Sequence, residues 1–186
     1  MVTQIQPLLT VADLDLMPED GNRYEIIEGE LFVSRAPGIQ HQLIVSNIIV
    51  EVRQYLNQNP TGIIVPGPGV IFDDLNGVIP DLLFVSNERR AEIASGDRVT
   101  GAPDIVIEIM SSGAANARRD RVVKWQLYGK YGVREYWIVN PAERRIEVYV
   151  TDGQMLVLAQ TLSIEDELTS SILPGFRCAV ARIFSI

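Results

Sequence analysis

The chain of 186 residues has one cysteine, one histidine and no long uninterrupted run of apolar residues. Cys178 cannot form an internal disulfide and has no Cys or His neighbour at zinc-like spacing, so we expect a small buried side chain without a catalytic role. No apolar run approaches the roughly 20 residues that span a bilayer, and residues 1–9 lack a basic segment followed by an apolar one. A cytoplasmic location without a membrane partner is therefore expected.

Positive charge is also scarce, because 16 Lys and Arg residues face 24 Asp and Glu residues, for a formal net charge of −8. Phosphate binding draws its affinity largely from Lys and Arg, so this balance argues against tight nonspecific binding to nucleic acid. Five of the sixteen basic residues nevertheless fall in one segment: Arg118, Arg119, Arg121, Lys124 and Lys130. That cluster needs an explanation of its own.

The composition, with 47% hydrophobic and 22% charged residues, is typical of soluble globular proteins. A chain of this length can bury a core without disulfides, and we find no repeat, low-complexity tract or linker. A single domain over residues 1–186 is therefore expected.

Hydrophobic periodicity predicts a short helix over 10–17, a hairpin of strands 24–27 and 30–34 around Glu28-Gly29, and a long helix over 40–57. The apolar stripe of that long helix consists of Leu43, Ile44, Ile48, Val52, Tyr55 and Leu56. Residues 62–72 are expected to form a strand with a bulge or bend at Gly67 and Gly69.

Further strands are expected over 78–85, 105–110, 135–139, 146–150 and 155–160. A helix over 114–131 should end at Gly132, and the tail from Ser163 should contain turns, a short helix and a final apolar segment. This order indicates an α/β or α+β fold, in which helices flank a mixed sheet between an N-terminal hairpin and a C-terminal β-meander.

Carboxylates interrupt two of the apolar strands. Asp81 opens one strand, and Glu108 lies inside another that begins after Asp104. Because side chains alternate along a strand, Asp104 and Glu108 should point to the same face. If the two strands are neighbours, Asp81 and Glu108 can hold a hard cation such as Mg²⁺ or Mn²⁺ through oxygen, which would offset their repulsion and lost hydration.

A purely structural explanation also accounts for these acids. In it, Asp81 caps a strand end, Asp104 belongs to a turn and Glu108 pairs with an arginine.

Lys124 has mostly aromatic and apolar neighbours at helical spacing, so it can extend beneath its helix toward the sheet edge as a catalytic residue. It can equally be an amphipathic lysine that packs its aliphatic stem. His41 stands near the start of the long helix and cannot build a zinc site alone. It is either structural or exposed, or it contacts a phosphate or water at the site.

At these residues the chain resembles the Uma-type restriction endonuclease family of the PD-(D/E)XK superfamily. The resemblance covers most of the chain and rests on residues 23–31, His41, Pro80-Asp81, residues 102–111, Arg119-Asp120, Lys124, Tyr128 and residues 132–141.

The resemblance implies a four-stranded mixed core sheet flanked by helices, with Asp81 and Glu108 holding Mg²⁺. The superfamily lysine normally lies two residues after the glutamate, where this chain has Met110, and the resemblance moves that role to Lys124. Lys124 would orient the attacking water or stabilise charge at phosphorus. Asp104 and His41 would be auxiliary residues, and the partner would be DNA.

The three arginines of the basic cluster would bind phosphates that flank the cleavage site: Arg118, Arg119 and Arg121. A solvated helix face explains these arginines as well. Resemblance alone suggests a homodimer.

Three functions follow from these patterns. The first is a Mg²⁺-dependent endonuclease that hydrolyses DNA. The second is a noncatalytic interaction protein that retains the nuclease fold, which the acidic charge and Met110 favour. The third is a carboxylate-based hydrolase of a small phosphate or a sugar, and the basic helix favours the phosphate.

Overall fold

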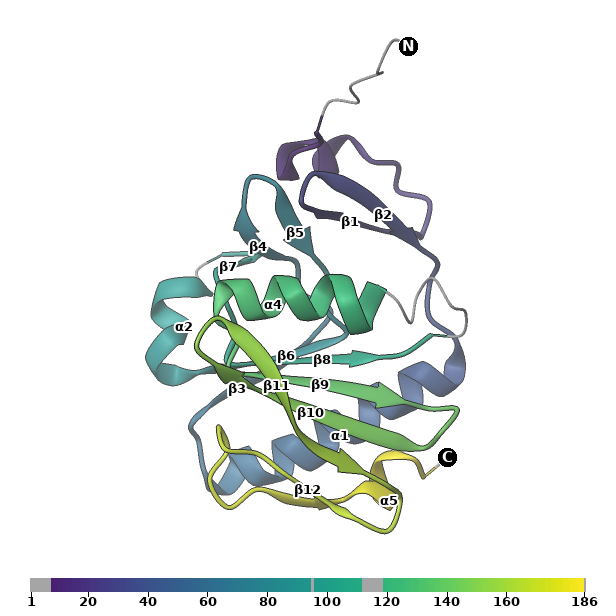
Figure 1. Ribbon diagram of the computed structural model, residues 1–186, viewed down its shortest axis with the longest axis vertical. Helices are drawn as coiled ribbons and strands as arrows, with labels where there is room; N and C mark the ends of the chain where they lie inside the picture. Colours follow the sequence, from purple (N-terminus) through teal and green to yellow (C-terminus); the bar gives the residue numbers. More distant parts are fainter. Residues whose placement is uncertain (1–7, 95, 112–118, 186) are drawn as a thin grey trace.

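The computed structural model describes residues 8–94, 96–111 and 119–185, which form mixed sheets flanked by helices (Figure 1). The elements in chain order are the 3₁₀ helix η1 (Val11–Leu16), β1 (Arg23–Ile27), β2 (Glu30–Ser34), α1 (Ile39–Gln58), β3 (Gly62–Pro66), β4 (Val70–Asp73), β5 (Asn76–Val78), β6 (Leu82–Ser86), α2 (Asn87–Ile93), β7 (Val99–Thr100), β8 (Ile105–Ile109), the π-helical turn η2 (Arg119–Lys124), α4 (Trp125–Tyr131), β9 (Glu135–Asn140), β10 (Arg145–Asp152), β11 (Met155–Leu162), β12 (Glu167–Thr169), β13 (Arg177–Ala179) and α5 (Val180–Ile183).

The central sheet has six strands in the order β11-β10-β9-β8-β6-β3. Strands β8 and β9 run parallel, and every other neighbouring pair is antiparallel, so the sheet is mixed. Strands β9, β10 and β11 form the expected C-terminal meander. The sheet therefore extends the four-stranded core that the family resemblance implies by two antiparallel strands.

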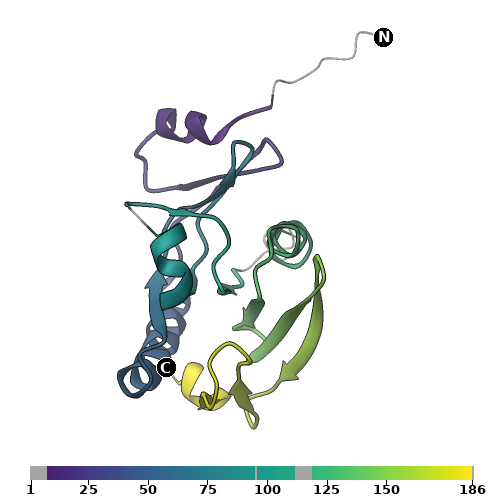
Figure 2. The same ribbon diagram turned by 90° about the vertical axis from the view of Figure 1, so that its left-hand side faces the viewer.

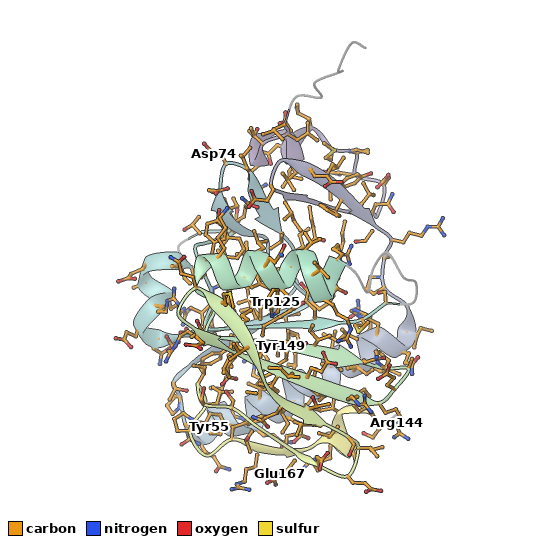
Figure 3. The ribbon with its side chains drawn as sticks, in the orientation of Figure 1. Tyr55, Asp74, Trp125, Arg144, Tyr149 and Glu167 are labelled. Atoms are coloured by element: carbon orange, nitrogen blue, oxygen red, sulfur yellow. The ribbon has the colours of Figure 1, made fainter. Side chains whose placement is uncertain are left out.

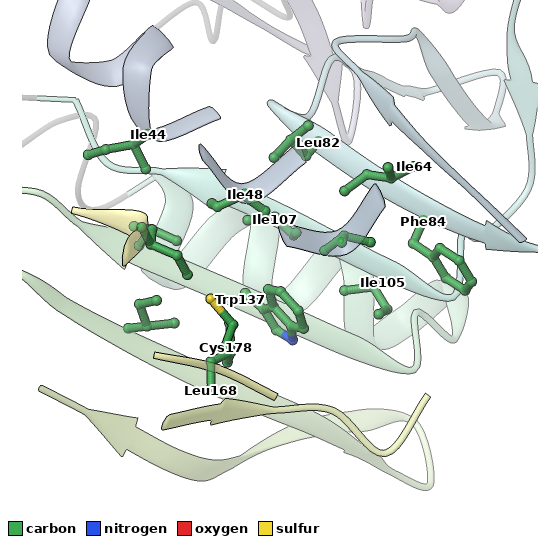
Figure 4. Close-up of a cluster of buried hydrophobic side chains, with 14 of the residues drawn as sticks. Ile44, Ile48, Ile64, Leu82, Phe84, Ile105, Ile107, Trp137, Leu168 and Cys178 are labelled. Carbon is green, nitrogen blue, oxygen red and sulfur yellow. The ribbon is translucent and has the colours of Figure 1, made fainter. Parts of the chain in front are cut away.

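Each face of the central sheet has its own core. Figure 2 shows α1, in blue, and α4, in green and seen end-on, on different sides of the molecule. Along β8, Ile105, Ile107 and Ile109 pack with α1 on one face, where Trp137 and Cys178 join them (Figure 4). Val106 points to the other face, which α4 covers. This alternation is the two-residue period expected of a strand buried on both sides.

The second face also contains Trp125 of α4 and Tyr149 of β10, both partly buried (Figure 3). Edge-on and stacked aromatic contacts link Phe72, Tyr128 and Tyr131 across this side. Helix α4 therefore contacts β4 through Phe72, and it contacts β9 of the central sheet through Tyr128 and Tyr136.

A second sheet of five strands, in the order β2-β1-β5-β4-β7, lies against this face and contains the N-terminal hairpin. The hairpin turns at Glu28 and Gly29, whose φ angles are 52° and 77°. Two successive positive φ angles are the requirement of a type I′ turn, which explains why Gly occupies the second position. The predicted hairpin is confirmed.

Two predicted strands are each divided in the structure. The segment expected as one bent strand over 62–72 forms β3 in the central sheet and β4 in the second sheet, with Gly67 between them at a φ of 58°. The segment expected over 78–85 likewise divides into β5 and β6 at Ile79-Pro80-Asp81. Because proline cannot donate a ladder hydrogen bond, the chain changes sheets where Pro80 stands.

The long helix matches its prediction within a residue at each end, and Ile44, Ile48, Val52 and Leu56 are buried. Leu43, expected in the buried stripe, is 39% exposed. The predicted helix over 114–131 is present as η2 and α4 from Arg119 onward, while residues 114–118 lie outside the described part.

Four short elements were not predicted: α2, β7, and the paired strands β12 and β13 in the tail. Gly132, with a φ of 80°, ends α4 as expected. Within the described residues, no helix combines the length and apolar character required to cross a membrane.

Candidate functional site

The strand register brings Asp81 and Glu108 together. Strands β6 and β8 are antiparallel, and their last pair on this side is Leu82 with Ile107. One step further, Asp81 stands across from Glu108, and alternation turns both side chains to the same face. Both are nearly inaccessible, at 6% and 3% exposure. The strands that carry Asp81 and Glu108 are therefore neighbours, as the prediction of a shared cation site requires.

Asp81 is held by donors from three elements. Its Oδ1 accepts a hydrogen bond from Arg23 Nη1 at 2.8 Å. Its Oδ2 accepts the backbone N–H of Ile109 at 2.9 Å and lies 3.0 Å from His41 Nε2. Burial alone would raise the pKa of Asp81, but the hydrogen bond and charge of His41 and the bond from Arg23 outweigh burial and lower the pKa to about 2. Asp81 is thus ionised at neutral pH.

Glu108 is held differently, through one oxygen. Its Oε1 accepts hydrogen bonds from Lys124 Nζ and from the Tyr128 hydroxyl, both at 2.8 Å. Complete burial raises the pKa of Glu108 to about 8, because the attraction of Lys124 does not offset burial and the neighbouring charge of Asp81. Asp120 and Glu25 add to that negative charge. The surroundings of Glu108 therefore favour its protonated form.

Lys124 is 1% exposed and lies between two glutamates. Its Nζ is 2.8 Å from Oε1 of Glu25 on β1 and 2.8 Å from Oε1 of Glu108 on β8. Burial alone would lower the pKa of Lys124, but the charges of Glu108 and Glu25 outweigh it and raise the pKa above its ordinary range. A charged lysine thus joins the two sheets.

A π-helical turn positions this lysine. The turn η2 (Arg119–Lys124) leads directly into the first turn of α4, and it buries both Asp120 and Lys124. The Tyr136 hydroxyl donates a hydrogen bond to the backbone oxygen of Asp120 at 3.0 Å, which fixes the turn to β9. Single π turns inside helices are frequent at functional sites, because they redirect side chains without ending the helix.

Asp81, Glu108 and Lys124 line a cavity of about 910 Å³ at the carboxyl ends of β8 and β9. Its floor includes Asp81, Glu108 and Lys124, and one wall is the connection from β2 to α1 with Arg35. The end of β9 contributes Asn140, and Met110 also lies on the lining. The cavity is large enough for a phosphate and a nucleoside fragment of a longer substrate.

His41 lies within the site, at the first turn of α1. It is 8% exposed, lines the cavity and contacts Asp81 through Nε2. Its Nδ1 is buried and has no hydrogen-bond partner among the described residues. His41 therefore orients Asp81 and presents one unsatisfied nitrogen close to the cavity.

Asp104 lies away from the site. It is on the same face of β8 as Glu108, as expected, but at the opposite end of the strand, and it does not line the cavity. Its Oδ2 accepts the backbone N–H of Ser86 at 2.8 Å, and its Oδ1 is 3.2 Å from Arg134 Nη1. These contacts join Asp104 to the end of β6 and to Arg134, outside the cavity.

The three candidate phosphate-binding arginines are separated. Arg119 lines the cavity and lies 3.8 Å from Glu25 and 3.3 Å from Asp120. Arg121 does not line the cavity and instead forms an ion pair with Glu147 of β10 at 2.5 Å. Arg118 lies outside the described residues.

Sequence reasoning gave no role to Glu25, Asp120 or Arg23. Glu25 contacts Lys124 and Arg23 contacts Asp81, while Asp120 lines the same cavity. Glu25 accepts the backbone N–H of Ile79 at 2.8 Å as well as binding Lys124. It alternates with apolar Tyr24 and Ile26 in a strand, which is the signal that marked Glu108. The strand was predicted, but its packing against the second face of the central sheet was not.

The donor set fits a hard divalent cation. Within the described residues, no group of three or more His, Cys, Asp and Glu side chains is placed to hold a metal ion, so protein ligands alone do not complete a site. Mg²⁺ is commonly bound by one or two carboxylates, with water and substrate phosphate as the remaining ligands. Asp81 and Glu108 supply two such carboxylates, and both line the same cavity.

The fold and this arrangement place the chain among nuclease-like α+β proteins. Its fold is similar to that of a crystal structure from Anabaena variabilis ATCC 29413, described as a "putative nuclease belonging to DUF820". The TM-score is 0.74 and the identity 18%, over 95% of this chain and 97% of that chain. Residues 11–181 match the Uma2 family, described as "Putative restriction endonuclease", and the chain belongs to that family. No curated protein matches the chain. The family resemblance and the predicted fold class are confirmed.

Proposed function

We propose that this protein is a divalent-metal-dependent nuclease that hydrolyses phosphodiester bonds of DNA. One observation carries the proposal: Asp81, Glu108 and Lys124 line a single cavity, with Lys124 Nζ 2.8 Å from Glu108 Oε1. Membership of a restriction endonuclease family supports a nucleic-acid substrate. The choice of DNA, and of Mg²⁺ or Mn²⁺ as the metal, belongs to the proposal.

Asp81 and Glu108 would hold the metal, which supplies Lewis-acid polarisation of the phosphate and a water of lowered pKa. Arg23, His41 and the Ile109 amide keep the Asp81 carboxylate ionised and oriented. Tyr128 fixes Oε1 of Glu108. The protein residues thus set the position and charge of the two carboxylates before substrate arrives.

Lys124 would act on the substrate side. Its ammonium has three donors, and the contacts with Glu25 and Glu108 use two of them. The third can donate to the attacking water or to a non-bridging phosphate oxygen, where negative charge grows in the transition state. Because burial and two carboxylates fix the ammonium, little reorganisation is needed during the reaction.

Plasmid cleavage in Mg²⁺ or Mn²⁺ tests the proposal. The variants Asp81→Asn, Glu108→Gln and Lys124→Gln keep side-chain size, and each is expected to lose about 100-fold or more in rate. Asp104→Asn is the matched control, because Asp104 is a buried carboxylate on the same strand face outside the cavity. Equal cleavage by the wild type and the three site variants would disprove a catalytic role.

A noncatalytic interaction protein is the second candidate, and the net charge of −8 favours it. In that case the contact between Lys124 and Glu108 would only stabilise the junction of the two sheets. Calorimetric titration separates the candidates: binding of neither divalent ions nor DNA at low salt would support the interaction protein, whereas metal-dependent cleavage would exclude it.

A further inference from the structure

Most cations in the described part of the chain are engaged by carboxylates. The exceptions are four exposed arginines that form no ion pair with another described residue: Arg35, Arg53, Arg90 and Arg144. In a protein with a net charge of −8, an unpaired guanidinium is the group most able to attract a phosphate. Their positions therefore indicate where a polyanion can lie.

Two of these four arginines lie at the cavity that Asp81, Glu108 and Lys124 line or next to it. Arg35 is on its lining, in the connection from β2 to α1. Arg144 lines a neighbouring hollow of about 420 Å³. Gln40 and Pro141 line both spaces, so the hollow continues the cavity past the start of α1 and the turn after β9. Arg35 thus lies on the lining of the cavity, and Arg144 lies in the adjoining hollow, on the far side of Gln40 and Pro141.

The backbone holds Arg144 in an unusual conformation. Its φ is 50°, in the left-handed region that non-glycine residues seldom adopt, within the tight turn between β9 and β10. Figure 3 shows Arg144 at the outer end of this turn, on the side of the molecule where β2 leads into α1. Its neighbours Glu143 and Arg145 pair with each other at 3.3 Å, so Glu143 does not neutralise Arg144.

We propose that Arg35 and Arg144 bind backbone phosphates of a DNA strand on the two sides of the scissile phosphate. This inference rests on the proposed nuclease function and defines the path of its substrate. The strand crosses the cavity from the connection between β2 and α1 to the turn between β9 and β10. Contacts of this kind position the strand without reading its sequence.

The salt dependence of DNA binding tests this path. A short fluorescein-labelled duplex and its single strand are titrated with the Glu108→Gln protein, which prevents cleavage, over a series of salt concentrations. Arg35→Ala and Arg144→Ala are each expected to reduce the slope of log affinity against log salt by about 0.9 for duplex or about 0.7 for single strand. The double variant should lose about twice as much.

Arg53→Ala and Arg90→Ala are matched controls, because both arginines are exposed and unpaired within the described residues yet line neither space. Their slopes should equal that of the Glu108→Gln parent. If the Arg35 and Arg144 variants behave as these controls do, the proposed path is wrong.

The two proposals fail in different ways. In the otherwise wild-type protein, loss of Arg35 or Arg144 should raise KM for cleavage at low salt and leave kcat nearly unchanged. Cleavage with unaltered KM in both variants would overturn the path and leave the nuclease function standing. Arginine-dependent binding without any cleavage by the wild type would retain the path and overturn the nuclease function. An absence of DNA binding at low salt would overturn both.

Discussion

At the scale of single residues, the charge state of Glu108 is the most informative property of the site. Its folded pKa of about 8 lies above the ordinary value of 4.5, mainly because of burial. Its contribution to stability is therefore complete below pH 4.5 and is lost as the pH rises toward 8.

The first prediction concerns the metal-free protein in EDTA. Glu108→Gln removes the ionisable group at nearly constant shape, so the variant should gain stability relative to wild type as pH increases over this window. The change should exceed about 1 kcal/mol, the free energy of one pKa unit. Urea unfolding at several pH values measures it, with exposed Glu143→Gln as the control for a lost negative charge. A pH-independent difference would show that Lys124 keeps Glu108 ionised.

Residue patterns were sufficient to propose Asp81 and Glu108, because an acid in an apolar strand contradicts its surroundings. Patterns left Lys124 open between catalysis and packing, and the family resemblance gave it the catalytic role. They could not place Asp104, since alternation gives the face of a strand and not which end meets a cavity. Glu25 carried the same alternating signal as Glu108. Its contact with Lys124 depends on how the second sheet packs, which no local pattern encodes.

At the scale of elements, the end of a helix was predictable where a residue such as glycine stops it. Gly132 ends α4 with a φ of 80°, and an added Cβ would meet nothing within 4 Å. The boundaries of strands were harder to predict from the sequence. Strands β5 and β6 form one apolar run in the sequence, although they belong to different sheets. Only Pro80 marks that change.

The second prediction uses this glycine. Gly132→Ala should lower the free energy of unfolding by about 1 kcal/mol, because alanine is strained in the left-handed region while the added methyl group has free space. Gly69→Ala is the matched control: its φ lies outside the left-handed region, and its added Cβ would meet only the Arg98 side chain, at 3.7 Å. That change should leave the free energy of unfolding unchanged or raise it by a few tenths of a kcal/mol. Urea unfolding of both variants decides, and equal losses would contradict a conformational origin.

At the scale of the whole molecule, the fold class followed from the order of elements, but the joining of two sheets around one buried charge cluster did not. The net charge of −8 and the buried carboxylates of the cavity make the folded state sensitive to cations in two ways. Ionic strength acts on the overall charge, whereas a site-bound divalent ion acts only where ligands converge. Stability measurements can separate these effects.

The third prediction follows from that difference. At a Mg²⁺ or Mn²⁺ concentration about 100 times its Kd, binding to the folded state adds about 2.7 kcal/mol. For a chain of this size that raises Tm by about 5–11 °C, at about 2–4 °C for each kcal/mol. Sodium chloride at matched ionic strength should reproduce only the general screening effect. Asp104→Asn should retain the divalent increment, and Asp81→Asn and Glu108→Gln should lose it. An equal increment in all four proteins would mean that the ions act on the net charge and that the two carboxylates do not form a metal site.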